Sequence, residues 1–148
     1  MQTIRADEFR GHRVRLAAWV KSDHAGSANL WMRIDGFAAT GGFAPNSGYQ
    51  NKTLDFDNMH DRQMTGTKNW KYQEVVLDVP LSAATVNFGL ILEGGGQAWV
   101  DDMILEVVTK RVRHTGGFVQ RDGPPPVSHE IAALAKYPLQ PQNLDFEQ

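Results

Sequence analysis

The fold is decided by the stretch Ala28-Asn29-Leu30-Trp31-Met32-Arg33-Ile34-Asp35. Three aliphatic side chains alternate there with an indole, a guanidinium and a carboxylate. A period of two predicts a β-strand that buries one face and exposes the other. The exposed face would carry Trp31, Arg33 and Asp35, which is unusual for a surface that only has to stay solvated.

The same alternation predicts further strands on both sides of this stretch. They span Arg13–Lys21, Leu54–Asp57, Trp70–Val79, Ala84–Glu93 and Gln97–Val108. Turn-forming residues separate them at Ser22–Ser27, Gly66–Asn69 and Gly94–Gly96, and a long Gly- and Asn-rich loop covers Gly36–Thr53. Because no helical pattern lies between the strands, we expect an all-β, antiparallel, jelly-roll-like β-sandwich.

The chain changes character after Val108. We expect residues 1–108 to form the β-sandwich domain and residues 109–127 to form a basic, proline-rich linker. In residues 128–148, Ser128 would cap a short helix that extends to Tyr137. A returning terminal strand over Asn143–Glu147 would then complete a sheet, of this molecule or of a neighbour.

Composition describes one ordinary globular domain. The chain has 148 residues, of which 41% are hydrophobic and 22% charged, and its formal net charge is −2. That charge gives no field suited to nucleic acid, and no apolar run is long enough to span a membrane. The absence of cysteine and of a signal-peptide core favours the cytoplasm.

Several motifs resemble a family of bacterial jelly-roll domains of the galactose-binding or carbohydrate-binding-module type. They are Gly11–Leu16, Trp19–Lys21, Leu30–Gly36, Phe56–Met59, Val75–Pro80 and Gln97–Asp102. The resemblance covers residues 2–108 and 143–147, and some family members are labelled transcriptional regulators. It implies the sandwich fold. It also implies a permuted arrangement, because a segment like Asn143–Glu147 commonly forms the opening strand in such domains.

Tryptophans on the outward-facing positions are candidates for ligand contact. Sugar-binding sandwiches place an aromatic ring against a pyranose and fix its orientation with flanking polar side chains. The candidate residues are Trp19, Trp31, Arg33, Asp35, Asn87, Trp99 and Asp101. The alternative is structural: the indoles would pack beneath the Gly36–Thr53 loop or beneath the carboxyl-terminal extension.

Three carboxylates after the Leu54–Asp57 strand are candidates for calcium. Asp55, Asp57 and Asp61 offer several oxygens within a few residues, as calcium requires. The alternative is that the first two only cap a turn through the backbone.

Signatures of catalysis are few in the sequence. There is no Gly-x-Ser-x-Gly elbow and no cysteine nucleophile, and His129-Glu130 lacks the second histidine of a zinc-protease motif. We therefore expect no enzyme, but a non-catalytic binding module for a carbohydrate or another small polar ligand. The alternative is a regulatory or assembly domain that binds protein, for example as a strand-exchanged homodimer.

Overall fold

The computed structural model describes residues 1–37, 51–117 and 125–144. In these ranges the chain forms two helices, a 3₁₀ helix η1 (His60–Arg62) and the α-helix α1 (Ser128–Ala133). The strands are β1 (Gln2–Arg5), β2 (Arg13–Ala25), β3 (Ser27–Phe37), β4 (Asn51–Asp57), β5 (Gly66–Asp78), β6 (Ala83–Glu93) and β7 (Gln97–Val108). No described helix has both the length and the apolar character needed to cross a membrane.

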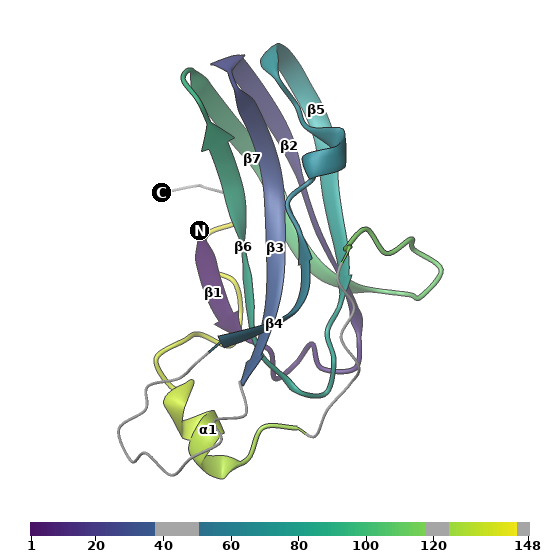
Figure 1. Cartoon of the computed structure of the whole chain (residues 1–148), viewed down its shortest axis with the longest axis vertical. Coiled ribbons are helices and arrows are strands. Elements are labelled where there is room, and N and C mark those ends of the chain that lie inside the picture. Colours follow the sequence, from purple (N-terminus) through teal and green to yellow (C-terminus); the bar gives the residue numbers. More distant parts are fainter. Residues whose placement is uncertain (38–50, 118–124, 145–148) are drawn as a thin grey trace.

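The strands form two antiparallel sheets that pack face to face (Figure 1). One sheet has the order β1-β6-β3-β4 and the other has the order β5-β2-β7. The prediction of an all-β antiparallel sandwich is therefore confirmed. The strand β1 was not predicted, because its four residues are too few to reveal a period of two.

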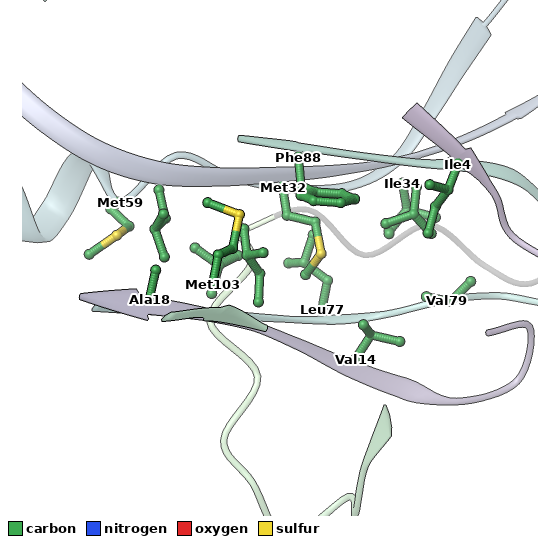
Figure 2. Close-up of a cluster of buried hydrophobic side chains, with 14 of the residues drawn as sticks. Ile4, Val14, Ala18, Met32, Ile34, Met59, Leu77, Val79, Phe88 and Met103 are labelled. Carbon is green, nitrogen blue, oxygen red and sulfur yellow. The ribbon is translucent and has the colours of Figure 1, made fainter. Parts of the chain in front are cut away.

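The core lies between the two sheets, as Figure 2 shows. On β2 the inward residues Val14, Leu16 and Val20 are fully buried. Figure 2 shows Val14 and Leu77 of one sheet opposite Met32, Ile34 and Phe88 of the other. Burying such side chains contributes on the order of 1.5–3 kcal/mol each. The alternation read from the sequence therefore identified the core faces correctly.

The strands β2 and β5 are longer than the sequence predicted. β2 continues through Ser22, which is buried and whose hydroxyl donates a 2.9 Å hydrogen bond to the carbonyl oxygen of Gly66 in β5. Register shifts on both sides of Ser22 mark bulges, which let polar, turn-like residues stay within a strand. The turn expected at Ser22–Ser27 is therefore reduced to Gly26 between β2 and β3, and the turn expected at Gly66–Asn69 is wrong, because these residues belong to β5.

The described part of the expected linker closes one side of the sandwich. Thr115 exchanges hydrogen bonds with Val76 of β5: its backbone N–H donates to the Val76 carbonyl at 2.9 Å, and its hydroxyl accepts the Val76 N–H at 2.8 Å. Gly116 has no room for a side chain, since a Cβ would overlap a carboxylate oxygen of Asp55 and lie 2.6 Å from Leu77 Cδ2. Residues 109–117 are therefore packed against the edges of β4 and β5.

The described carboxyl-terminal residues also belong to the folded body. The helix α1 ends at Ala133, earlier than expected, and is followed at once by the fully buried Leu134. The carbonyl oxygen of Pro138 accepts the Arg5 N–H at 2.8 Å, so the chain lies along the outer edge of β1. Leu144 packs against the core, without strand structure. The rest of the expected terminal strand lies outside the described residues.

Candidate ligand-binding face

The outer face of the β5-β2-β7 sheet carries exposed aromatic rings at its centre. The inward positions of β2 are filled by core residues, so the alternation turns Trp19 and Lys21 outward. Trp19 lies directly across from Tyr72 of β5 on one side and from Asp101 of β7 on the other. Lys21 lies across from Trp99 of β7.

The rings of this face remain open to solvent. Trp19 and Tyr72 are each 43% exposed, and their ring centroids lie 5.8 Å apart with the planes at 68°. Trp99 is 41% exposed, and the ammonium of Lys21 lies 5.4 Å from its ring centroid. Large aromatic rings are usually covered in a folded domain, so exposed rings that lie together mark a surface suited to binding.

A charged row borders the aromatic pair on one side. The guanidinium of Arg15 binds a carboxylate oxygen of Glu106 through two nitrogens and lies 3.7 Å from Glu74. The hydrogen bonds to Glu106 raise the pKa of Arg15 above its usual range. Partial burial and nearby Glu74 raise the pKa of the Tyr72 phenol, which therefore stays protonated at neutral pH and can donate a hydrogen bond.

A groove of about 680 Å³ opens at the aromatic pair. Its walls on the sheet are Trp19, Tyr72 and three consecutive residues of β7, Asp102 to Ile104. β7 bulges here: the register against β2 shifts between Ala17 and Trp19, and Asp102 has a left-handed φ of 49°. The carboxyl-terminal segment supplies the rest of the lining through Pro141, Asn143 and Leu144.

A second hollow, of about 310 Å³, lies on the other side of Tyr72. It is bounded by β5 and by the segment that contains η1. Its lining residues are Met59, Arg62, Met64, Lys71, Tyr72, Gln73, Glu74 and Thr115. Tyr72 thus borders both hollows.

The predicted site residues divide between two opposite faces of the sandwich. Trp19, Trp99 and Asp101 lie on the outer face of the β5-β2-β7 sheet. Four others lie on the other sheet, in β3 and β6: Trp31, Arg33, Asp35 and Asn87. The seven residues therefore do not form one surface, because the sequence predicts the period of each strand but not the sheet to which it belongs.

Trp31 is outward-facing but covered. It pairs across the sheet with Gly89, and its indole nitrogen lies 3.3 Å from the position that a Gly89 Cβ would occupy. The backbone of Met1 approaches the same position to 3.0 Å. Only 9% of Trp31 is exposed, so the expectation of an open ring holds for Trp19 and Trp99 but not for Trp31.

The polar residues beside Trp31 bind one another. Two nitrogens of the Arg33 guanidinium bind the two carboxylate oxygens of Asp35: Nε lies 2.9 Å from Oδ1, and Nη2 lies 2.9 Å from Oδ2. Asp35 is fully buried. The amide of Asn87 donates to Asp35 at 3.0 Å and accepts the hydroxyl proton of Thr3 at 2.8 Å. Such a satisfied network stabilises the sheet and leaves little capacity for a ligand.

Each of the carboxylates proposed for calcium lies against a basic side chain of the protein. Asp55 is buried and lies 2.6 Å from His114 Nε2; burial raises the pKa of this carboxyl. Asp57 and Asp61 both bind the guanidinium of Arg62, at 2.5 and 2.8 Å. The described residues contain no group of three or more His, Cys, Asp or Glu side chains that could hold a metal ion. Within the described residues the three carboxylates are therefore not gathered into one cluster of ligands, and their role in binding calcium stays a prediction.

Two features of the face were missed in the sequence. Tyr72 was correctly expected to point outward, but nothing local indicates that β5 pairs with β2 and places it beside Trp19. The wall from Pro141 to Leu144 is contributed by residues far along the chain. Neither contact leaves a signal in a single sequence, because both depend on tertiary pairing.

Comparison with known proteins relates the chain to a regulator. It is 39% identical over 116 residues to YbfP of Bacillus subtilis strain 168, an uncharacterised HTH-type transcriptional regulator. The aligned part is 78% of this chain and 35% of YbfP, so the chain spans about a third of that relative's length. No protein-family model matches the chain, and no solved structure is significantly similar. The link to regulators is thus supported, whereas the galactose-binding type stays a prediction.

Proposed function

We propose that this domain is a non-catalytic binding module for a carbohydrate or another small polar ligand. The ligand would lie in the groove beside Trp19 and Tyr72. The observation that carries the proposal is the pair of exposed, adjacent rings at the wall of a 680 Å³ groove. An aromatic ring contributes apolar contact to a sugar face, while neighbouring polar groups fix the orientation.

The relation to YbfP gives this binding a role. In a transcriptional regulator, a domain of this kind would sense a small molecule for the part that binds DNA. Such a domain would act in the cytoplasm, in agreement with the lack of cysteine.

The test is a tryptophan-fluorescence titration after a screen on a glycan array. We expect Trp19→Ala and Tyr72→Ala each to weaken binding of a captured glycan about tenfold or more, since one aromatic contact contributes about 0.5–1.5 kcal/mol beyond its buried area. Trp70→Ala is the matched control: Trp70 is also 43% exposed, but it lines neither described hollow. Circular dichroism checks that each variant is folded.

Two outcomes would overturn the proposal. One is the lack of any response across a broad panel of saccharides. The other is an equal loss of binding in Trp70→Ala, because the aromatic pair would then have no special part in recognition.

The second candidate function is a regulatory domain that binds protein through the same face. It is favoured by the exposed apolar side chains beside the aromatic pair, Ile104 at 44% and Trp99 at 41%, and by the relation to a regulator. Light scattering decides between the two: a dimer at micromolar concentration that Trp19→Glu dissociates would favour protein binding.

A further inference from the structure

The groove beside Trp19 and Tyr72 carries a negative charge and no positive one. Among the described residues that line it, Asp102 is the charged side chain, and there is no lysine, arginine or histidine. Asp102 is exposed, and only its backbone N–H takes part in a hydrogen bond, so its carboxylate has no partner within the described residues. A ligand in the groove would therefore meet an unpaired carboxylate and no competing cation of the protein.

A bulge in β7 places Asp102 at the wall of the groove. The register between β2 and β7 shifts between Ala17 and Trp19, and Asp102 has a left-handed φ of 49°. A second left-handed residue, Asn143 with a φ of 53°, lines the same groove. The described ranges contain four such residues other than glycine, and two of them meet here. Bulges and left-handed residues gather at binding sites, where they redirect side chains.

The two aromatic rings add a second attraction for a cation. The face of an aromatic ring is electron-rich and attracts an ammonium group within about 6 Å of its centroid. Another ring of this sheet face already has such a partner, since the Lys21 ammonium lies 5.4 Å from the Trp99 centroid. Among the described residues no ammonium or guanidinium is paired in this way with Trp19 or Tyr72. Their planes meet at 68°, so the two rings give the groove walls of different direction.

The charges around the groove also favour a cationic ligand. Arg15 is bound by Glu106 and lies near Glu74, so its charge is compensated. Asp101 lies directly across from Trp19 and adds a further carboxylate beside the rings. Much of the remaining lining is apolar, as at Ile104 and Leu144, and suits alkyl groups better than a hydrated metal ion.

We infer that the groove binds a small organic cation, a substituted ammonium ion whose alkyl groups contact Trp19 and Tyr72 and whose charge is balanced by Asp102. The apolar part of the lining contacts the rest of the ligand. The inference rests on the proposed function in one respect, that the groove beside Trp19 is a small-molecule site, and it adds the charge of the ligand. It does not depend on the binding of a saccharide.

The experiment is calorimetry with choline and with its uncharged isostere, in which a carbon atom replaces the nitrogen. We expect choline to bind about tenfold more tightly than the isostere, because only choline gains from the ring faces and the carboxylate. Asp102→Asn should weaken the binding of choline about threefold to fivefold, as the loss of an exposed ion pair does. Trp19→Ala should weaken it about fivefold or more.

Asp61→Asn is the matched control for the charge. It removes a carboxylate from a side chain that is 81% exposed and lines neither described hollow, so the affinity for choline should stay unchanged. Asparagine tolerates a left-handed φ as aspartate does, so Asp102→Asn keeps the bulge of β7. Circular dichroism checks the fold of each variant.

The outcomes separate this inference from the proposed function. The inference is overturned if choline binds no better than its isostere, or if Asp102→Asn and Asp61→Asn have the same effect. If a neutral saccharide binds in a Trp19-dependent way and choline does not bind, the inference is overturned and the binding module stands. If choline binds as expected and no saccharide does, the carbohydrate alternative fails and the cation site stands. If neither binds, both fail.

Discussion

Gln73 shows how one side chain can act as a piece of strand. It is buried on the inner face of β5, where its amide oxygen accepts the Leu30 N–H at 2.9 Å and its amide nitrogen donates to the Ala28 carbonyl at 3.0 Å. The neighbouring β4 pairs with β3 only from Met32 onward, so these two backbone groups have no strand beside them. Gln73 satisfies both and ties the two sheets together.

Replacing Gln73 should therefore destabilise the domain. Gln73→Ala leaves a buried donor and a buried acceptor without partners, and each such loss costs about 1–3 kcal/mol. Urea unfolding measures the change, with Gln97→Ala as control. Gln97 is exposed on β7, and its replacement should stay within about 0.5 kcal/mol of the parent. Equal effects in the two variants would show that the amide contributes nothing specific.

For single residues, the sequence predicts well which way a side chain points, but poorly what surrounds that side chain. Alternation placed Trp19 and Trp31 on outward positions, and both do point away from the core. Whether such a ring remains exposed to solvent depends on the residue opposite it on the neighbouring strand. Trp19 lies opposite the large side chain of Tyr72. Trp31 lies opposite Gly89, which has no side chain to hold the indole away from the backbone.

At the scale of elements, a cluster of charges anchors the segment that follows β7. Asp78 of β5 binds the guanidinium of Arg13 through two nitrogens, at 2.9 and 2.8 Å, and also the ammonium of Lys110 at 2.9 Å. Arg13 in turn donates to the Val112 carbonyl at 2.7 Å. Two strands and the segment 109–117 are thus joined at one end of the sheet.

This cluster predicts a dependence of stability on pH. The hydrogen bonds from Arg13 lower the pKa of Asp78 from 3.8 to about 2. A carboxyl with a lowered folded-state pKa stabilises the fold above its unfolded pKa, and this contribution is lost as the pH falls toward 2. Because the group is partly exposed, we expect Asp78→Asn to cost about 1 kcal/mol at pH 6 and progressively less below pH 4.

Urea unfolding at pH 6, 4, 3 and 2 checks this expectation. Asp101→Asn is the control, since Asp101 is exposed and its hydrogen bond from the Asp102 N–H can be kept by asparagine. A cost of Asp78→Asn that does not change with pH would contradict the role given to the lowered pKa.

The elements themselves were largely predictable, unlike their pairing. The period of two identified β2 to β7, because each has one face in the core, although β4 begins at Asn51, within the expected loop, and not at Leu54. It failed at β1, which is short, and at the polar end of β2, where bulges keep Ser22 in the strand. It also missed that residues 109–117 bind the edges of β4 and β5, because their basic composition resembles that of a solvated linker.

On the scale of the whole molecule, the carboxyl-terminal segment contributes to the stability of the sandwich. Leu134 is fully buried although it follows a helix of six residues, and Leu144 packs against the core. Figure 1 shows α1 beside one end of the strands, with the chain returning from it toward β1. The sandwich and this segment should therefore unfold together.

Leu134→Ala tests this cooperation. Truncating a buried leucine costs about 2–5 kcal/mol, and the loss should appear in a single unfolding transition of the entire domain. Leu139→Ala is the control, because Leu139 is 44% exposed and should change the stability little. A separate early transition in Leu134→Ala would show that the segment folds independently.

The contact between two turns at the end of the sandwich away from α1 suggests where to attach a reporter. Gly26 forms the turn between β2 and β3, and a Cβ there would lie 2.5 Å from the Glu93 carbonyl oxygen. Gly94 and Gly96 belong to the turn between β6 and β7; both have left-handed φ angles and lie against the β2–β3 hairpin. Gly95 between them faces open space. A short peptide tag inserted at Gly95 would therefore leave both hairpins intact and give a labelling point for binding assays on immobilised protein.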